Sequence, residues 1–134
     1  MTIYKSSDGR TSFELRQTDF SDENGSKTYC FTCRINSHGF TAEVENIWFY
    51  REDLLKFADE LDTLIKKPEG GKASLEAMTD FSCDVQASDC LGHFTIKTKL
   101  ESHMYQNSTS LMAEAETQSL SNLARELKVI AQST

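Results

Sequence analysis

The clearest structural signal in the sequence is FYREDLLKFADELDTLIKK, which runs from Phe49 to Lys67. Its apolar residues recur at the i, i+3, i+4, i+7 spacing that places one face of a helix against a core. Pro68 and the Gly70-Gly71 pair follow and end the pattern. The stretch therefore predicts one long amphipathic helix, with these residues on its buried face: Leu54, Phe57, Ala58, Leu61, Leu64 and Ile65.

The same apolar pattern recurs near the C-terminus at a constant offset, since 120 − 54 = 66 for Leu120 and Leu54. The polar residue Glu60 has a counterpart in Glu126 at the same offset. The second apolar stripe consists of Leu120, Leu123, Ala124, Leu127, Ile130 and Ala131. Two such helices, each preceded by strand-like sequence, predict two pseudo-repeated halves, at about 11–67 and 73–132, within a single domain over 1–134.

Alternating apolar residues predict three strands before the first helix and four before the second. Polar segments at Asp19–Lys27 and Glu101–Ser108 predict loops, and Thr117 is a candidate N-cap. The apolar parity changes near Glu45-Asn46, which predicts a β-bulge. The predicted strands are Thr11–Gln17, Thr28–Asn36, Phe40–Phe49, Ala73–Ala77, Phe81–Ala87, Phe94–Leu100 and Leu111–Ala115. The order βββαββββα predicts an α+β fold of antiparallel sheet with two long helices on one face.

Composition and charge narrow the classes of function. The chain has 134 residues and a formal net charge of −7. Affinity for phosphate backbones rests on Lys and Arg, so this charge predicts that nucleic acid is not a partner, whereas it suits a basic protein partner. The N-terminal residues do not resemble a signal peptide, and no apolar run approaches the roughly 20 residues that span a membrane. We therefore expect a cytoplasmic protein with no membrane partner.

The four cysteines do not indicate a metal site. Cys30 and Cys33 have the C-x2-C spacing, but they lie in an alternating strand that directs their side chains to opposite faces. Cys83 and Cys90 form a second, wider pair. Buried free thiols are the simpler interpretation, and we expect neither a metal nor another cofactor.

No combination of residues in the sequence indicates an enzyme. His38, His93 and His103 stand in turns or loops, and a structural role for His93 at the start of a strand is the simpler interpretation. Glu43 and Glu45 share one face of a strand, which a solvated sheet face explains equally well. An enzyme would need a cleft in which His93 or His103 meets a carboxylate.

The outward face of the first helix is the best candidate for a partner surface. Glu52, Asp59 and Asp62 make this face acidic, while the corresponding positions of the second helix are not acidic. An ordinary solvated helix face is the alternative interpretation. If the face does bind a partner, a basic protein fits it.

Four segments together resemble the bacterial WapI-like immunity proteins over roughly Phe40 to Ile130. They comprise DLLKFADELDTL from Asp53, KASLEAMTDFSCDV from Lys72, the Gly92 turn into HFTIKTKL, and LMAEAETQSLSNLARELKVI from Leu111. The sequence departs from the family pattern at Ala113 and Ala115, where aromatic residues are usual, and at Glu116, where an Asp is usual.

The resemblance implies a small cytoplasmic protein that neutralises a toxin domain by stoichiometric binding. Two other functions stay open: an enzyme, or a module that binds a small ligand or peptide on an open sheet face near Trp48 or Tyr29. A homodimer is also possible, through an exposed sheet edge at Phe13–Gln17 or through the outward Val129.

Overall fold

The structure is a computed structural model that describes residues 3–7, 10–69, 71–78, 81–89, 91–102 and 107–132. It contains the predicted order of strands and helices, preceded by one strand that the sequence did not predict. The elements are β1 (Ile3–Ser7), β2 (Thr11–Glu23), β3 (Ser26–Ser37), β4 (Phe40–Tyr50), α1 (Arg51–Lys66), β5 (Ala73–Glu76), β6 (Phe81–Ala87), β7 (His93–Ser102), β8 (Asn107–Glu116) and α2 (Thr117–Gln132).

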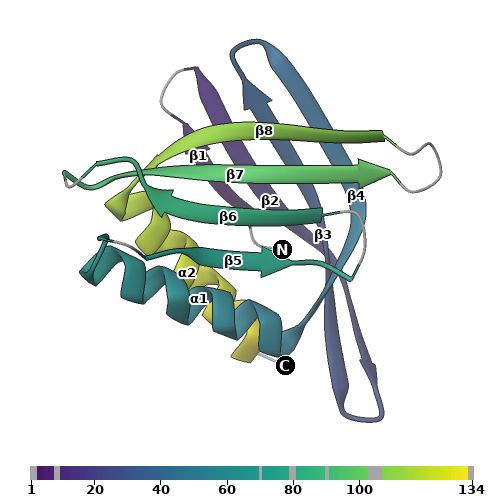
Figure 1. The fold of residues 1–134 in the computed structure, drawn as a ribbon. Coiled ribbons are helices and arrows are strands. Elements are labelled where there is room, and N and C mark those ends of the chain that lie inside the picture. The colour runs from purple at the N-terminus through teal and green to yellow at the C-terminus, as the bar shows by residue number, and fades with distance from the viewer. Residues whose placement is uncertain are drawn as a thin grey trace.

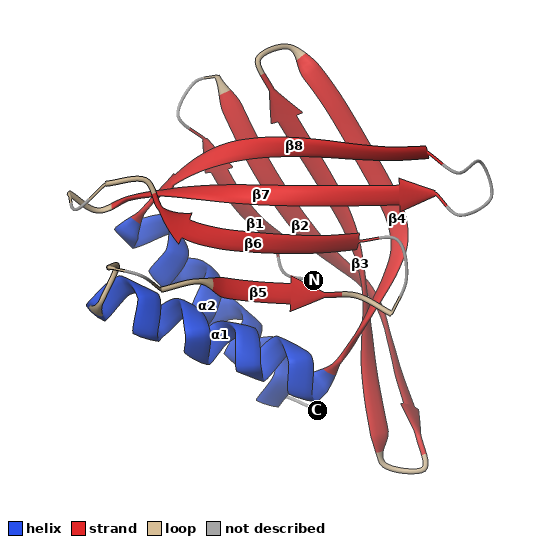
Figure 2. Cartoon of the chain, viewed as in Figure 1, coloured by secondary structure: helices blue, strands red, loops and turns tan. Residues whose placement is uncertain are grey.

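The strands form two antiparallel four-stranded sheets, β1-β2-β3-β4 and β5-β6-β7-β8. We call them sheet A and sheet B. Sheet B lies across sheet A at a steep angle, and the two helices lie side by side, with α1 next to β5 (Figure 1). Figure 2 shows both helices on the same side of the crossed sheets. The α+β prediction with antiparallel sheets and two helices is confirmed.

The two helices bury the faces that their sequence patterns predicted. Each spans 16 residues, and their first residues, Arg51 and Thr117, are 117 − 51 = 66 positions apart. Every predicted core position is buried except Ile65, which is half-buried. The first helix begins at Arg51 rather than Phe49, because Phe49 is fully buried as the inward residue of β4.

The predicted loop at Asp19–Lys27 is wrong. These residues continue β2 and β3 as a hairpin, with register pairs that extend to Glu23 and Ser26. The turn is made by Asn24 and Gly25, with φ angles of +56° and +84°. Asn-Gly readily adopts the left-handed conformation that a two-residue hairpin requires, so this dipeptide was the signal in an otherwise polar segment. The hairpin projects beyond the rest of the fold in Figure 1.

The predicted bulge near Glu45-Asn46 is confirmed. The β3–β4 register passes from Cys33↔Val44 to Phe31↔Ile47, so β4 carries one more residue than β3 over this interval. Asn46 has φ +60°, a left-handed conformation that asparagine tolerates better than most residues. Beyond the bulge, Ile47 and Phe49 face the core, as the change in apolar parity requires.

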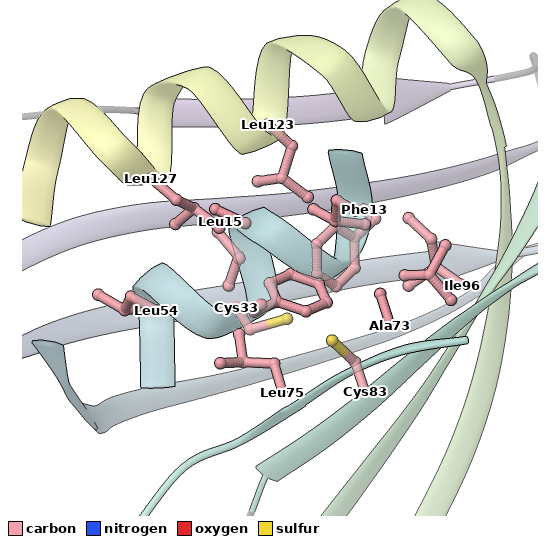
Figure 3. Packing of buried hydrophobic residues seen from close by; sticks show 14 of the residues in the cluster. Phe13, Leu15, Cys33, Leu54, Ala73, Leu75, Cys83, Ile96, Leu123 and Leu127 are labelled. Carbon is pink, nitrogen blue, oxygen red and sulfur yellow. The ribbon is translucent and has the colours of Figure 1, made fainter. Parts of the chain in front are cut away.

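One core joins both sheets and both helices. Figure 3 shows side chains from β2, β3, β5, β6, β7, α1 and α2 converging on the same interior. Phe49 is central to it, with ring centroids 5.6 Å from Phe31 in sheet A and 5.7 Å from Phe81 in sheet B. Tyr29 is also fully buried, so the expectation that it lines an open sheet face is wrong.

The strand at Thr11–Gln17 is not an exposed sheet edge, because β1 pairs with it from Ile3↔Arg16 to Ser7↔Ser12. Val129 is exposed on α2, as predicted. No helix within the described ranges is both long enough and apolar enough to cross a membrane.

Candidate functional site

The three acidic residues predicted to bind a partner do not form one free anionic surface. Glu52 and Asp59 are exposed on α1, but the ammonium of Lys128 on α2 forms an ion pair with Asp62. The Lys128 ammonium also lies 3.7 Å from an Asp59 carboxylate oxygen. The hydrogen bond that Lys128 donates to Asp62 is the main reason that the pKa of Lys128 is raised. Two of the three carboxylates therefore link α1 to α2.

The cysteines lie where the strand pattern predicted. Cys33 points into the core and Cys30 lies on the opposite face of β3, although both are buried. The Cys33 and Cys83 sulfur atoms lie near each other in the core (Figure 3). Burial is the main cause of the raised pKa of both thiols. Among the described residues no cluster of three or more His, Cys, Asp or Glu could hold a metal ion, and Cys90 lies outside those residues.

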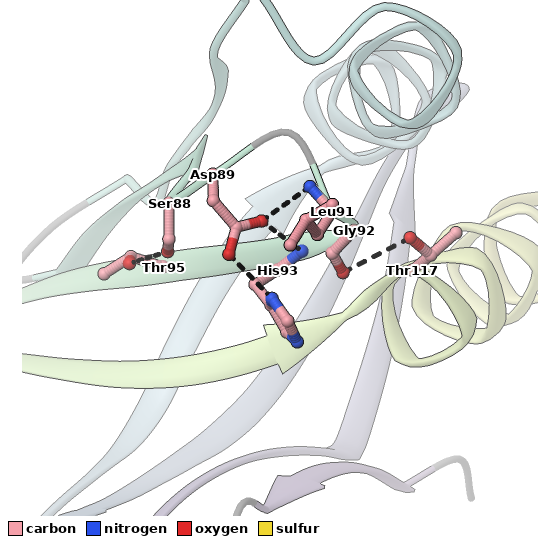
Figure 4. A network of polar contacts seen from close by, with 7 residues as sticks. All are labelled: Ser88, Asp89, Leu91, Gly92, His93, Thr95 and Thr117. Carbon is pink, nitrogen blue, oxygen red and sulfur yellow. Dashed lines mark hydrogen bonds and ion pairs between the residues drawn. The ribbon is translucent and has the colours of Figure 1, made fainter.

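His93 does meet a carboxylate, on the exposed turn between β6 and β7 (Figure 4). Its Nδ1 lies 2.8 Å from an Asp89 carboxylate oxygen. The other Asp89 oxygen accepts the backbone N–H of Leu91 at 2.7 Å and that of His93 at 3.4 Å. Asp89 thus fixes both the turn and the imidazole, but the pair stands on the surface and not in a cleft. His38 lies in the β3–β4 turn, and His103 lies outside the described residues.

The turn between β6 and β7 is hydrogen-bonded to the start of α2. Gly92 has φ +90°, and its carbonyl accepts both the backbone N–H and the hydroxyl of Thr117, at 3.2 and 3.4 Å. The Thr117 hydroxyl, predicted to cap α2, therefore donates to Gly92 across the turn. The hydroxyls of Ser88 and Thr95, on the same hairpin, form a hydrogen bond with each other. These hydrogen bonds give His93 a structural role in the turn.

The Asp89–His93 pair should make stability depend on pH. The hydrogen bond between the two side chains is the main cause of both shifts: it lowers the pKa of Asp89 and raises that of His93. A carboxyl group whose pKa is lowered stabilises the folded protein above the ordinary Asp pKa, and this stabilisation is lost in acid. An imidazole whose pKa is raised stabilises the folded protein below the ordinary His pKa, and this stabilisation is lost in base. The contribution of the pair is therefore greatest between about pH 4 and pH 6.5.

Asp89→Asn tests this dependence, because the amide oxygen can still accept the two backbone N–H groups. We expect the His93 pKa, measured by proton NMR, to fall in the variant. A smaller upward shift should remain, because Glu116 and Glu114 also raise the pKa of His93. The stability lost on substitution should be larger at pH 5.5 than at pH 8.5. An equal loss at both values would show that the ion pair contributes nothing.

The surface with the most distinctive chemistry is the outward face of sheet A, along the β2–β3 hairpin and the end of β4. Trp48 and Tyr50 are two residues apart on β4, so both side chains lie on this face. Trp48 is half-buried and Tyr50 is 44% exposed. They line a groove of about 400 Å³, which we call the Trp48 groove. Its lining residues are Ser21, Glu23, Asn24, Ser26, Thr28, Trp48, Tyr50 and Met78.

Strand register explains why these residues meet. Ser21 pairs with Thr28, and Thr28 pairs with Tyr50, so two hydroxyls and a phenol form one row across β2, β3 and β4. The backbone N–H of Met78 donates to the Trp48 carbonyl at 2.9 Å, which holds the segment after β5 against β4. The groove therefore combines two aromatic rings and a thioether with hydroxyl and amide groups.

From the sequence, Trp48 was predicted only as one residue of a possible open sheet face. Residues 48–50, WFY, were the available signal, because alternation along a strand puts the first and third rings on the same side. The remaining lining residues come from the β2–β3 hairpin, which was predicted as a loop, and from the segment after β5. Their convergence depends on register pairs that the sequence pattern did not specify.

A second groove, of about 660 Å³, runs along the outward face of α1. Its lining includes the apolar side chains of Leu55 and Leu64 together with lysines and carboxylates. Glu52 and Asp59 line it, whereas Asp62 does not. This groove has no aromatic ring in its lining, and its mixed charges favour neither an anionic nor a cationic ligand.

No protein-family model matches this sequence, and no curated protein matches it either. The resemblance to the WapI-like immunity proteins therefore stays an untested prediction. Similarity was found instead among solved structures. WHY3 from Arabidopsis thaliana has a TM-score of 0.54 at 6% identity, with 98% of this chain and 86% of that chain covered.

Two further solved structures are also similar to this chain. The plant transcriptional regulator PBF-2 has a TM-score of 0.55 at 5% identity, over 97% of this chain and 80% of that chain. WHY1 from Arabidopsis thaliana has a TM-score of 0.54 at 6% identity, over 97% of this chain and 82% of that chain. Identities this low show a shared fold alone.

The shared fold corrects two predictions. Structures that match nearly the whole chain include a transcriptional regulator, which belongs to a class that acts on nucleic acid. The prediction of a toxin-neutralising immunity protein is therefore wrong, and so is the exclusion of nucleic acid as a partner. The exclusion considered only the attraction between phosphates and Lys or Arg, and net charge says nothing of contacts with the bases. Stacking of bases on aromatic rings needs no positive charge.

Proposed function

We propose that this chain is a non-catalytic protein that binds single-stranded nucleic acid in the Trp48 groove. The observation that carries the proposal is the pair of accessible aromatic rings, Trp48 and Tyr50, on the open face of sheet A. Bases stack on such rings whatever their sequence, and each stacked base contributes about 1–3 kcal/mol. The fold shared with a transcriptional regulator supports the same reading.

A single strand fits this groove better than a duplex does. Base faces are accessible only when bases are unstacked from their neighbours, so aromatic platforms recognise single strands and splayed loops. The hydroxyls of Ser21, Ser26 and Thr28 supply donors and acceptors for base edges and sugars beside the rings. A groove of about 400 Å³ is a cleft of the size that holds small ligands, and a duplex is far wider.

The negative charge of the chain shapes the expected binding behaviour. With a net charge of −7, few phosphates can be neutralised on binding. The logarithm of the affinity should therefore fall with the logarithm of salt concentration with a slope of about −1 or shallower. The proposal also includes a reducing compartment such as the cytoplasm, which the free thiols of Cys30, Cys33 and Cys83 support.

Trp48 allows a direct test, because it is the only tryptophan in the chain. A single-stranded oligonucleotide of roughly ten nucleotides, a common site size for this class of protein, should quench its fluorescence. Replacement of Tyr50 by alanine should weaken binding by about 5- to 150-fold, the loss of one stacked base. Trp48→Ala, followed by anisotropy of a labelled oligonucleotide, should weaken it similarly.

Matched controls separate stacking from folding. Tyr50→Phe keeps the ring and should keep most of the affinity, and Val129→Ala changes an exposed residue on α2 outside the groove. A duplex of the same sequence should bind much more weakly. The proposal is overturned if both ring deletions leave affinity within twofold of wild type, or if the duplex binds as tightly as the single strand.

A further inference from the structure

We infer that the Trp48 groove selects guanine, and that Glu23 is the residue that selects it. This inference rests on the proposed function and goes further, because stacking alone does not distinguish bases. Among the described residues that line the groove, Glu23 supplies the only charged side chain. It stands at the end of β2 opposite Ser26, next to the Asn24-Gly25 turn.

Strand geometry places Glu23 on the same face of sheet A as the two rings. Glu23 is two residues from Ser21, so both side chains lie on the outward face of sheet A. Glu23 and its partner Ser26 lie next to the row that runs from Ser21 through Thr28 to Tyr50. Glu23 is exposed, and no described residue forms a hydrogen bond or ion pair with its carboxylate. Its oxygens are therefore available to the edge of a base that stacks on Tyr50 or Trp48.

A carboxylate accepts hydrogen bonds and donates none. Guanine is the base whose pairing edge presents two adjacent donors, the ring N1–H and the exocyclic amino group, which match the two carboxylate oxygens. Adenine and cytosine present one amino donor beside an acceptor nitrogen. Thymine and uracil present a single N–H between two carbonyl oxygens, which repel the carboxylate. The expected order is therefore guanine first and thymine or uracil last.

The same charge also orients the strand. Glu23 repels phosphate, so the sugar–phosphate backbone should lie away from the β2–β3 turn while base edges point toward it. Asn24 and Ser26 lie on either side of Gly25 and add neutral donors and acceptors to this end of the groove. The residues at the turn end of the groove therefore bind base edges, and the rings of Trp48 and Tyr50 on β4 are the surfaces on which bases stack.

The test compares oligothymidines of roughly ten nucleotides in which one central thymidine is replaced by guanosine, inosine or adenosine. Inosine is guanosine without the exocyclic amino group, so it offers one donor in place of two. We expect guanosine to bind about tenfold more tightly than thymidine at that position, with inosine between them. Affinities are measured by quenching of Trp48 and by anisotropy.

Glu23→Gln should reduce the guanosine preference to less than about threefold, because the amide replaces one acceptor with a donor. Asp22→Asn is the matched control: it removes a neighbouring carboxylate that points to the other face of β2 and does not line the groove. This control should leave the preference unchanged.

The outcomes distinguish the two proposals. Equal affinity for all four oligonucleotides, lost on ring deletion, overturns guanine selection and leaves single-strand binding supported. A guanosine preference that survives Glu23→Gln overturns the role of Glu23. Absence of any quenching or anisotropy change overturns both proposals together.

Discussion

Replacing Phe49 with alanine is expected to lower the free energy of unfolding by about 3–5 kcal/mol, the usual cost of removing a buried phenylalanine ring. Phe49 is fully buried, and its ring meets Phe31 of sheet A and Phe81 of sheet B edge-on. The substitution leaves a cavity where the two sheets meet, and it removes both aromatic contacts. Chemical denaturation followed by circular dichroism measures the loss.

Tyr50→Ala is the matched control for this loss. Tyr50 is the next residue, but its side chain points outward and is 44% exposed. Its replacement should change stability by no more than about 0.5 kcal/mol, as is usual for surface positions. If Phe49→Ala does not fold, Phe49→Leu retains part of the buried volume and should give a smaller, measurable loss. Equal effects at positions 49 and 50 would contradict the placement of Phe49 between the sheets.

The second large effect is expected at Gly92, where alanine should destabilise the protein by about 2–3 kcal/mol. The φ angle of +90° is one that residues with a Cβ rarely adopt, at a cost of about 1–2 kcal/mol. A Cβ at this position would also lie 2.9 Å from the Thr117 hydroxyl. That hydroxyl must then rotate away from the Gly92 carbonyl, and the lost hydrogen bond adds about 0.5–1.5 kcal/mol.

Gly39→Ala separates these two causes. Gly39 has φ +91°, but a Cβ there would meet nothing within 4 Å. It should therefore show the backbone cost alone, about 1–2 kcal/mol. In the double variant Gly92→Ala/Thr117→Ala, the second substitution should cost less than Thr117→Ala does in the wild type. Additive effects, measured by thermal or chemical denaturation, would show that the two residues are not in contact.

The helices illustrate how much of the fold follows from local sequence. The period of about 3.6 residues in Leu54, Phe57, Leu61 and Leu64 is a property of the chain itself, and so is its recurrence 66 residues later. A helix satisfies its own backbone hydrogen bonds, so its buried face can be predicted without knowledge of its partners. The bulge at Glu45-Asn46 was predicted for a related reason, because a change of apolar parity must be accommodated within the strand.

The candidate site was not predictable in the same way. Trp48 and Tyr50 were visible as aromatic residues, but Glu23, Ser26 and Met78 join them only through the register of β2 on β3 and the attachment of Met78 to β4. The charge balance pointed away from nucleic acid, because it accounts for phosphate contacts and not for the aromatic rings on which bases can stack. The acidic face of α1 was identified correctly as acidic, but Lys128 of α2 neutralises part of it.

The sequence by itself determined the two helices, the central parts of seven strands and their apolar faces, because these depend on spacing along the chain. The crossing of the two sheets was decided only in the tertiary structure, as was the pairing of β1 with β2. The same holds for the assembly of the Trp48 groove. The physical reason is that strands, unlike helices, satisfy their hydrogen bonds with segments distant in sequence, so the register of the whole sheet decides which outward side chains become neighbours.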